Sequence, residues 1–208
     1  MPATLLCGRR LNNPKRSFSL CHEGFEATGF SPELVISVDN GKVTAEPLAG
    51  TRSCIGTEAE ALAQELLNDP KEIVEHVMSV KESKRGSVQH LGSRVTGDLS
   101  PDKYIWDAFN VAFPSITASG IPKQAAIEAI QRLEKKPREL YAGAVFMLED
   151  TKSFEAALVL RTVFQDRHHQ WIQAGAGVIS QSHPQRELTE TREKMASIAP
   201  FVVAEARN

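Results

Sequence analysis

The stretch AGAGVISQSHPQRELTETREK, residues 174–194, is the most informative part of this sequence. Its glycine-rich first half predicts a strand that ends in a hairpin. Pro184 predicts the start of a helix, because the first helical turn does not need the N–H that proline lacks. Glu187, Glu190 and Lys194 then lie three and four residues apart, so they share one helix face. Two carboxylates and an ammonium on one face could hold a divalent metal and an anionic ligand, or form ordinary surface ion pairs.

Length and composition describe an ordinary globular chain. It has 208 residues, 41% of them hydrophobic, and a net charge of −2, which is enough for one or two cores. The near-neutral charge provides no basic surface for nucleic acid or for a membrane. The cysteines Cys7, Cys21 and Cys54 are sparse and odd in number, which disfavours a disulfide framework. No stretch reaches the length of a membrane span or a signal sequence, so we expect a cytoplasmic protein with reduced thiols.

Local patterns predict an α+β fold with antiparallel sheets, in a single domain over residues 1–208, because strand runs and helix runs are mixed without strict alternation. The expected strands cover 16–21, 25–30, 33–38, 42–46, 87–97, 141–149, 154–165 and 169–180. The expected helices cover 57–68, 70–84, 102–112, 122–135 and 184–198. Asn40-Gly41 predicts a tight hairpin turn.

Eight motifs follow one another in a distinctive order: SPELV (31–35), EPLAGTR (46–52), KEIVEH (71–76), GSVQHLGS (86–93), TASGIPK (117–123), YAGAVF (141–146), LVLRT (158–162) and QAGAGVI (173–179). The ordered set resembles the chorismate-utilising enzymes, which include the anthranilate, aminodeoxychorismate, isochorismate and salicylate synthases. The sequences of GSVQHLGS and TASGIPK are similar to those of the salicylate synthase branch of this family. This resemblance implies part of the chorismate-utilising-enzyme fold, with antiparallel sheets and helices packed outside them.

The resemblance also implies a magnesium site. Chorismate carries two carboxylates, a ring hydroxyl and an enolpyruvyl ether, so its site needs a metal, cations, anion-binding N–H groups and a proton donor. Glu75 and Glu190 match the family's metal glutamates, and Glu187 matches a carboxylate that acts close by through water. Mg²⁺ commonly takes few carboxylates together with substrate oxygens. On spacing alone, helix glutamates of this kind are usually solvated.

Arg161 is the candidate anion-binding residue on a strand. Alternation places it on the face shared by Glu155 and Ala157. An arginine among small residues on a half-buried strand needs an anionic partner, either a salt-bridge carboxylate or a ligand. The resemblance implies that Arg161 and Tyr141 hold the pyruvyl carboxylate of the substrate, and that the backbone N–H of Gly175 is offered to the same group.

Further substrate contacts are implied by the same resemblance. Gly50 and Thr51, together with Thr117, match backbone and hydroxyl contacts to the ring and its carboxylate. Lys194 matches a lysine that meets a substrate carboxylate, and its alternative is an ion pair with Glu190 one turn earlier.

Two residues match catalytic positions. Glu33 in SPELV aligns with the general acid that protonates the departing ring hydroxyl, a role that needs a raised pKa from a dry or anionic neighbourhood. Its alternative is a charge at a strand edge. His90 matches a histidine near the enolpyruvyl arm, useful when pyruvate is eliminated, and its alternative is a structural strand histidine. Lys123 in SGIPK is interpreted as a surface lysine at a helix start.

Two departures from the family bear on activity. Relatives have a large N-terminal half before the region of Arg9-Arg10, and the lysine that activates water lies in a strand within it. Relatives also have about two dozen more residues between His76 and Gly86. None of the lysines at 15, 81 and 84 lies in the base's motif. We also expect the missing elements to leave the sheet faces of 25–46 and 87–97 uncovered, which favours self-association or a partner chain.

The sequence therefore predicts a truncated salicylate-synthase-like protein of siderophore-type or other secondary metabolism that binds chorismate or isochorismate with Mg²⁺. If it is an enzyme, pyruvate elimination from isochorismate is the favoured reaction, since that step is pericyclic in character and needs no activated water. The alternatives are a non-catalytic paralogue or partner subunit, a split enzyme completed by another chain, and a pocket used for a different pericyclic reaction.

Overall fold

The computed structural model describes residues 1–12, 14–53, 80–85, 88–180 and 182–203, and for 49–53, 80–85 and 88–93 it describes the backbone alone. All strand pairs among these residues are antiparallel, which confirms the predicted α+β class. The strands are β1 (Phe18–His22), β2 (Phe25–Gly29), β3 (Leu34–Asp39), β4 (Lys42–Glu46), β5 (Leu48–Ser53), β6 (Val80–Arg85), β7 (Val88–Ser93), β8 (Val95–Asp98), β9 (Ala144–Leu148), β10 (Ser153–Leu158), β11 (Thr162–Gln165) and β12 (Gln170–Ile172).

Within the described part of the chain these strands form three sheets. The first sheet has the order β1-β2-β11-β12, the second β8-β4-β3-β10-β9 and the third β5-β7-β6. The hairpin between β3 and β4 turns at Asn40 and Gly41, whose φ angles of 50° and 82° lie in the left-handed region. Asparagine and glycine tolerate that region best, so the sequence prediction of this turn is confirmed.

One antiparallel ribbon joins the first two sheets. β2 pairs with β11 in the first sheet, and the same two chain segments continue as β3 and β10, which pair in the second. Both segments change sheet together, at residues 30–33 and 159–161. The crossing is held by Phe30 N–H donating to the Arg161 carbonyl at 3.1 Å and by Leu158 N–H donating to the Glu33 carbonyl at 3.2 Å. Glu33 and Arg161 therefore lie on neighbouring segments at one bend.

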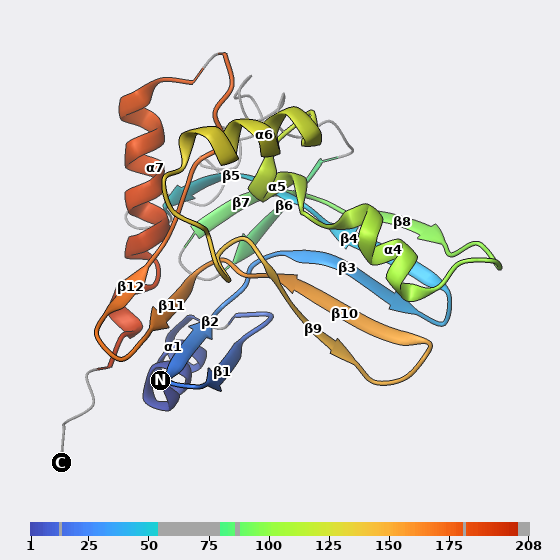
Figure 1. Ribbon diagram of the computed structural model, residues 1–208, viewed down its shortest axis with the longest axis horizontal. Coiled ribbons are helices and arrows are strands. Elements are labelled where there is room, and N and C mark those ends of the chain that lie inside the picture. The colour runs from blue at the N-terminus through green and yellow to red at the C-terminus, as the bar shows by residue number, and fades with distance from the viewer. Residues whose placement is uncertain (13, 54–79, 86–87, 181, 204–208) are drawn as a thin grey trace.

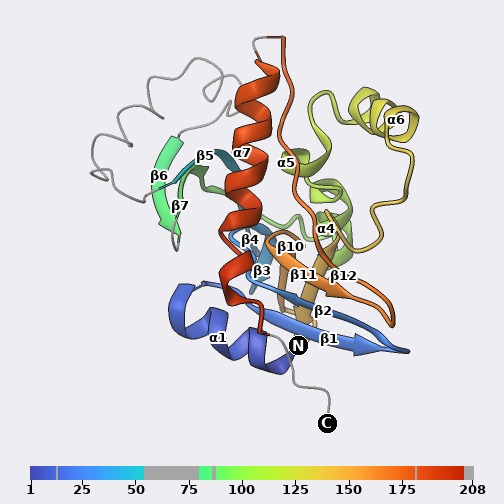
Figure 2. The same cartoon turned by 90° about the vertical axis from the view of Figure 1, so that its left-hand side faces the viewer.

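The helices pack around this framework (Figures 1 and 2). They are α1 (Pro2–Asn12), α4 (Ile105–Ala112), α5 (Ile116–Ser119), α6 (Lys123–Leu133), α7 (Pro184–Ala196) and a 3₁₀ turn, η1 (Ala199–Phe201). α4 covers β3 and β10, because its Ile105 packs in one cluster with Val35, Ile36 and Phe154. α7 stands beside β5, and residues 173–180 run along it in both views. Pro184 begins α7, as predicted.

A second core lies at the N-terminal end, where α1 packs beside β2 and η1. Its buried members are Met1, Phe30, Val163, Ile198 and Phe201. Gly8 is required in α1 because a Cβ at this position would overlap the ring of Phe30. No helix in the part of the chain described here is long and apolar enough to span a membrane.

Several predicted element boundaries are wrong. Residues 80–85, expected at the end of a helix, form β6 and pair with β7. The expected strand 154–165 is broken at 159–161, so Arg161 does not share a strand face with Glu155. The expected strand 169–180 ends at Ile172, and the short helix α5 was not predicted. The helix expected at 57–68 and most of the one at 70–84 lie outside the described residues.

The predicted exposed face on residues 25–46 is also wrong. Leu34, Val35, Ile36 and Val38 of β3 are at most 4% exposed, since α4 and β10 cover them. For residues 87–97 the side chains described begin at Arg94. The apolar side chains that do remain exposed lie elsewhere, prominently on the edge strand β9.

Candidate functional site

Glu33 is buried where the ribbon changes sheet, with only 1% of its surface exposed. Ser31, fully buried, fixes the backbone here: its hydroxyl donates to the Leu158 carbonyl at 2.5 Å and lies 3.2 Å from the Glu33 carbonyl. The Glu33 side chain points toward the loop before α5, where the Ser115 hydroxyl donates to Oε1 at 3.0 Å. A carboxylic acid is thus held in a protein interior by two serines.

Burial raises the pKa of Glu33 from 4.5 to about 7, against the lowering effects of Ser115, Thr117 and the Leu48 backbone. Among the described residues only Ser115 makes a hydrogen bond of good geometry, and the buried Oε2 has no such partner. Desolvation therefore decides the shift. A carboxyl group with a pKa near 7 holds a proton that it can donate at neutral pH, so the environment fits the predicted acid and not a solvated strand-edge charge.

Arg161 lies between β10 and β11 with a φ of 50°. The left-handed region is unfavourable for a residue with a Cβ, and residues held there cluster at functional sites. Its side chain is buried, at 9% exposure, and burial lowers the pKa of its guanidinium to about 10, while Tyr141 and Glu190 raise it. The described residues provide no carboxylate within ion-pair distance. A buried guanidinium in this state is suited to an anionic ligand.

Tyr141 and Glu190 lie close enough to the same guanidinium to raise its pKa, and Gly175 and Lys194 lie beside these two residues. A Cβ on Gly175 would lie 3.2 Å from the Tyr141 hydroxyl, so glycine leaves room at this contact. Lys194 Nζ lies 2.6 Å from Glu190 Oε1 and donates to the Gly175 carbonyl at 2.9 Å. Burial raises the pKa of Tyr141, opposed by Arg138 and by Arg161. The structure thus brings together four residues that the sequence analysis assigned to substrate binding: Tyr141, Arg161, Gly175 and Lys194.

Lys194 makes the ion pair with Glu190 that was its alternative interpretation. An ammonium group has three N–H donors, and the contacts to Glu190 and Gly175 use two of them. One donor is left for a ligand carboxylate. The ion pair and the substrate contact are therefore compatible.

Of the three glutamates predicted to bind metal, the structure describes two. Glu187 and Glu190 are 8% and 6% exposed on one face of α7, while Glu75 lies outside the described residues. Over the ranges that the structure describes, no group of three His, Cys, Asp or Glu side chains is placed to hold a metal ion. Two nearly buried carboxylates one turn apart nevertheless provide the oxygen ligands that a hard cation takes.

The remaining predicted residues have less structural detail. Gly50 and Thr51 lie on β5 and His90 on β7, and Thr51 is paired with His90 across the two strands; their side chains are outside the described set. Thr117 is on α5, close enough to Glu33 to lower its pKa. Lys123 donates to the Val111 carbonyl at 3.2 Å, at the C-terminal end of α4, in agreement with a structural role.

Ser115 is a site residue that the sequence analysis did not identify. Serine before a short helix is a standard capping signal, but the partner of its hydroxyl lies 82 positions away in the sequence. No local pattern could have indicated that contact.

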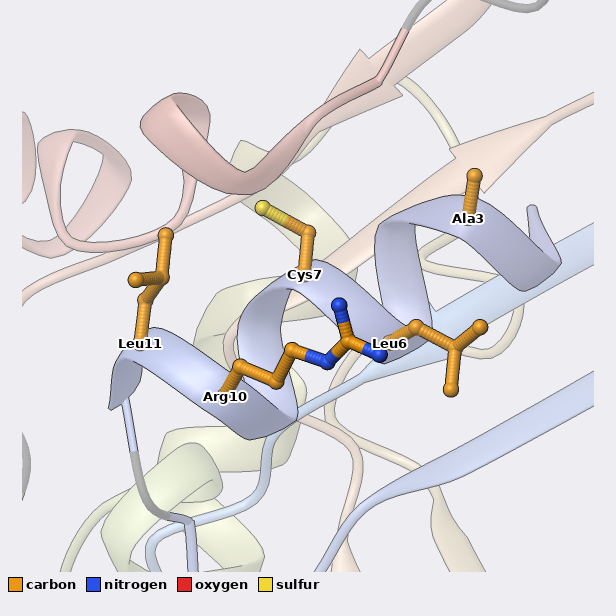
Figure 3. A pocket seen from close by; sticks show the side chains of 5 residues that line it. All are labelled: Ala3, Leu6, Cys7, Arg10 and Leu11. Atoms are coloured by element: carbon orange, nitrogen blue, oxygen red, sulfur yellow. The ribbon is translucent and has the colours of Figure 1, made fainter.

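A separate hollow of about 440 Å³ lies on the outer face of α1 (Figure 3). It is lined by Ala3, Leu6, Cys7, Arg10 and Leu11. It contains one cation and no carboxylate, and none of the residues gathered around Arg161 or Glu33 lines it. We therefore place the candidate site at the sheet crossing and α7.

Comparison with known proteins gives a consistent result. The sequence profile described as chorismate binding enzyme matches residues 1–83 and 81–200. A salicylate synthase of Mycolicibacterium paratuberculosis strain K-10 is 43% identical over 229 aligned positions, covering 98% of this chain and 51% of that protein. The crystal structure of anthranilate synthase component I from Streptococcus pneumoniae TIGR4 superposes with a TM-score of 0.82 at 32% identity, covering 94% of this chain and 48% of the other.

A putative 2,3-dihydroxybenzoate-specific isochorismate synthase from Bacillus anthracis also superposes with a TM-score of 0.82, at 25% identity and over 61% of its chain. The chain spans about half the length of the relatives that it matches. The profile match is divided at residues 81–83, and the alignment with the salicylate synthase is longer than this chain. Both observations agree with the internal gap expected between His76 and Gly86.

Proposed function

This chain belongs to the chorismate-binding enzyme family, and from this we propose that it is a salicylate-synthase-like protein that binds chorismate or isochorismate with Mg²⁺. We further propose that it eliminates pyruvate from isochorismate in a pathway of secondary metabolism. The observation that carries the proposal is the buried Arg161 guanidinium beside Tyr141, with Gly175 next to Tyr141 and Lys194 bonded to the Gly175 carbonyl.

Two separate cationic groups suit a substrate with two carboxylates. Arg161, with Tyr141 and the Gly175 backbone, would hold the pyruvyl carboxylate, and Lys194 would use its third donor for the other carboxylate. Arginine provides a planar fork of N–H groups that matches a carboxylate, whereas lysine provides a point charge. Gly50, Thr51 and Thr117 would contact the ring and its carboxylate from β5 and α5, and β5 lies beside α7.

Glu190 and Glu75 would hold Mg²⁺, with Glu187 acting through a bound water. The metal would supply positive charge to a substrate carboxylate when bound. The buried carboxylates of Glu187 and Glu190 fit that group, because they bring negative charge into a region that already contains Arg161 and Lys194.

Glu33 would act as the acid that protonates the departing ring hydroxyl when chorismate is converted to isochorismate, since its raised pKa keeps a proton available near neutral pH. Elimination of pyruvate does not use this proton. His90 would lie near the enolpyruvyl arm. Elimination of pyruvate needs no attacking water and asks only for groups that bind and orient isochorismate, and for this reason we propose it.

Ligand binding can be tested by thermal unfolding. Mg²⁺ with chorismate or isochorismate should raise the melting temperature of the wild type, because a ligand that binds only the native state stabilises it. Glu190→Gln should remove the shift, and Glu128→Gln, an exposed glutamate on α6, should keep it. A folded wild-type protein with no shift at millimolar ligand and Mg²⁺ would overturn the proposal.

Turnover is tested by mass spectrometry of the products. Supplied isochorismate should yield pyruvate and salicylate. Binding of both ligands without any product would indicate the non-catalytic alternative.

A further inference from the structure

Ser115 occupies the N-cap position of α5 but does not cap it. Serine is favoured at this position because its oxygen accepts a hydrogen bond from a backbone N–H of the first turn. Here the hydroxyl makes no such bond and instead donates to Glu33 Oε1 at 3.0 Å. The Ser115 side chain is 5% exposed and Glu33 is 1% exposed, so water cannot substitute freely for this contact.

The two oxygens of Glu33 are therefore unequal. Oε1 accepts from Ser115, while Oε2 is buried with no partner of comparable geometry among the described residues, although the Thr117 hydroxyl and the Leu48 backbone lie close enough to the carboxyl to lower its pKa. A hydroxyl that donates to one oxygen favours the acidic proton on the other, since a carboxylic acid then presents its carbonyl oxygen to the donor. When the group ionises, the same hydrogen bond becomes charge-assisted and stronger.

We propose that Ser115 is a positioning residue for the Glu33 acid, one that holds Oε1 as the acceptor and leaves Oε2 to carry and deliver the proton. The inference deepens the proposed function, because it takes Glu33 as the acid of that site. The direction of the hydroxyl supports it, since the Ser115 side chain makes its hydrogen bond with Glu33 and none with the first turn of α5.

The test is direct titration of Glu33 by NMR of protein labelled with ¹³C at the glutamate carboxyl carbon, with Glu33→Gln identifying the resonance. Ser115→Ala should raise the pKa of Glu33 by about one unit, because hydrogen bonds to charged groups contribute more than neutral ones. Ser115→Thr should return it toward the wild-type value. Ser119→Ala is the matched control, as the Ser119 hydroxyl donates to the Ser115 carbonyl and not to a carboxylate.

The titration uses no substrate, so its result is independent of whether the chain turns over isochorismate. If Ser115→Ala lowers the melting temperature but leaves the titration of Glu33 unchanged, Ser115 is only a structural residue and the inference is wrong. If the Thr variant does not fold, the comparison of the Ala variant with Ser119→Ala still decides the question. A shifted titration in a protein that binds no chorismate would show that Ser115 sets the pKa of Glu33 and would reject the proposed function.

Discussion

At the scale of single residues, Glu33 and Arg161 differ from surface charges because both are buried and both have shifted pKa values. They are 1% and 9% exposed, they carry opposite charges when ionised, and they are not paired with each other in an ion pair. Burial works against the charged form of both: it raises the pKa of the carboxyl and lowers that of the guanidinium. A charged ligand that binds here can therefore change the pKa values of both groups.

The shifted pKa of Glu33 has a consequence for stability. The unfolded chain releases this proton near pH 4.5, whereas the native state keeps it until about pH 7. Between these values the native state binds more protons, so the free energy of unfolding should fall as the pH rises, by on the order of 3 kcal/mol in total. The stabilisation is fully present below pH 4.5 and is lost as the pH passes through 7.

Glu33→Gln should remove this contribution, because an amide does not titrate. Urea unfolding of both proteins at pH 5 and pH 8 measures it: the wild type should lose more stability than the variant between the two values. Parallel losses would show that Glu33 has an ordinary pKa in the native protein, and the acid role would lose its support.

At the scale of elements, the decisive feature is the bend where two segments change sheet together. Ser31 stabilises it from inside, because its buried hydroxyl satisfies the Leu158 carbonyl while the Glu33 carbonyl accepts from Leu158 N–H. An ideal strand could not present Glu33 and Arg161 from adjacent segments in this way. The bend is thus the element that assembles the site.

Ser31→Ala should lower the free energy of unfolding by about 1 kcal/mol, since the Leu158 carbonyl loses this donor but still accepts from Leu160 N–H. Ser100→Ala, at an exposed position before α4, should change it by less than about 0.5 kcal/mol. Chemical denaturation of the two variants beside the wild type measures the difference. Equal values for both variants would mean that the crossing is held by its backbone hydrogen bonds alone.

Local signals in the sequence were sufficient for some elements and not for others. Asn40-Gly41 and Pro184 act through their own backbone preferences, and the elements that they predict are present. β6 was missed because its residues, VKESKR, form a strand through pairing with β7, a non-local contact. β12 ends at Ile172, and beyond it the Gly175 carbonyl accepts from Lys194 on α7 instead of pairing with a neighbouring strand.

The site shows the same division. The shared helix face of Glu187, Glu190 and Lys194 followed from spacing, and the structure has it. The left-handed backbone of Arg161 could not be predicted, because it is imposed by the crossing and no glycine or asparagine marks it. The contact between Ser115 and Glu33 depends on the packing of elements that are far apart in the sequence. The spacing of apolar and polar residues does not predict such a contact.

At the scale of the whole molecule, the edge of the second sheet carries an exposed apolar surface. Among the described strands, β9 lies at this edge and pairs with β10. Its sequence, AVFML, has no charge, and Phe146, Met147 and Leu148 are 56%, 60% and 47% exposed. Successive side chains point to opposite faces of a strand, so apolar groups are exposed on both sides of this edge. Trp106, 45% exposed, lies against Phe146 with ring centroids 5.6 Å apart and extends the patch.

We expect this edge to pair with a second copy of the chain, since natural edge strands are usually protected by charges, proline or a bulge, and β9 has no charge or proline. Light scattering coupled to gel filtration at tens of micromolar should show a dimer or a larger species. Met147→Lys should shift the protein toward the monomer, because a lysine on the edge must be desolvated when another strand pairs with it. Thr151→Lys adds the same charge at an exposed position just beyond the strand and should leave the association unchanged. A wild-type protein that is monomeric throughout this range would contradict the expectation and show that an apolar edge of this length is tolerated in solution.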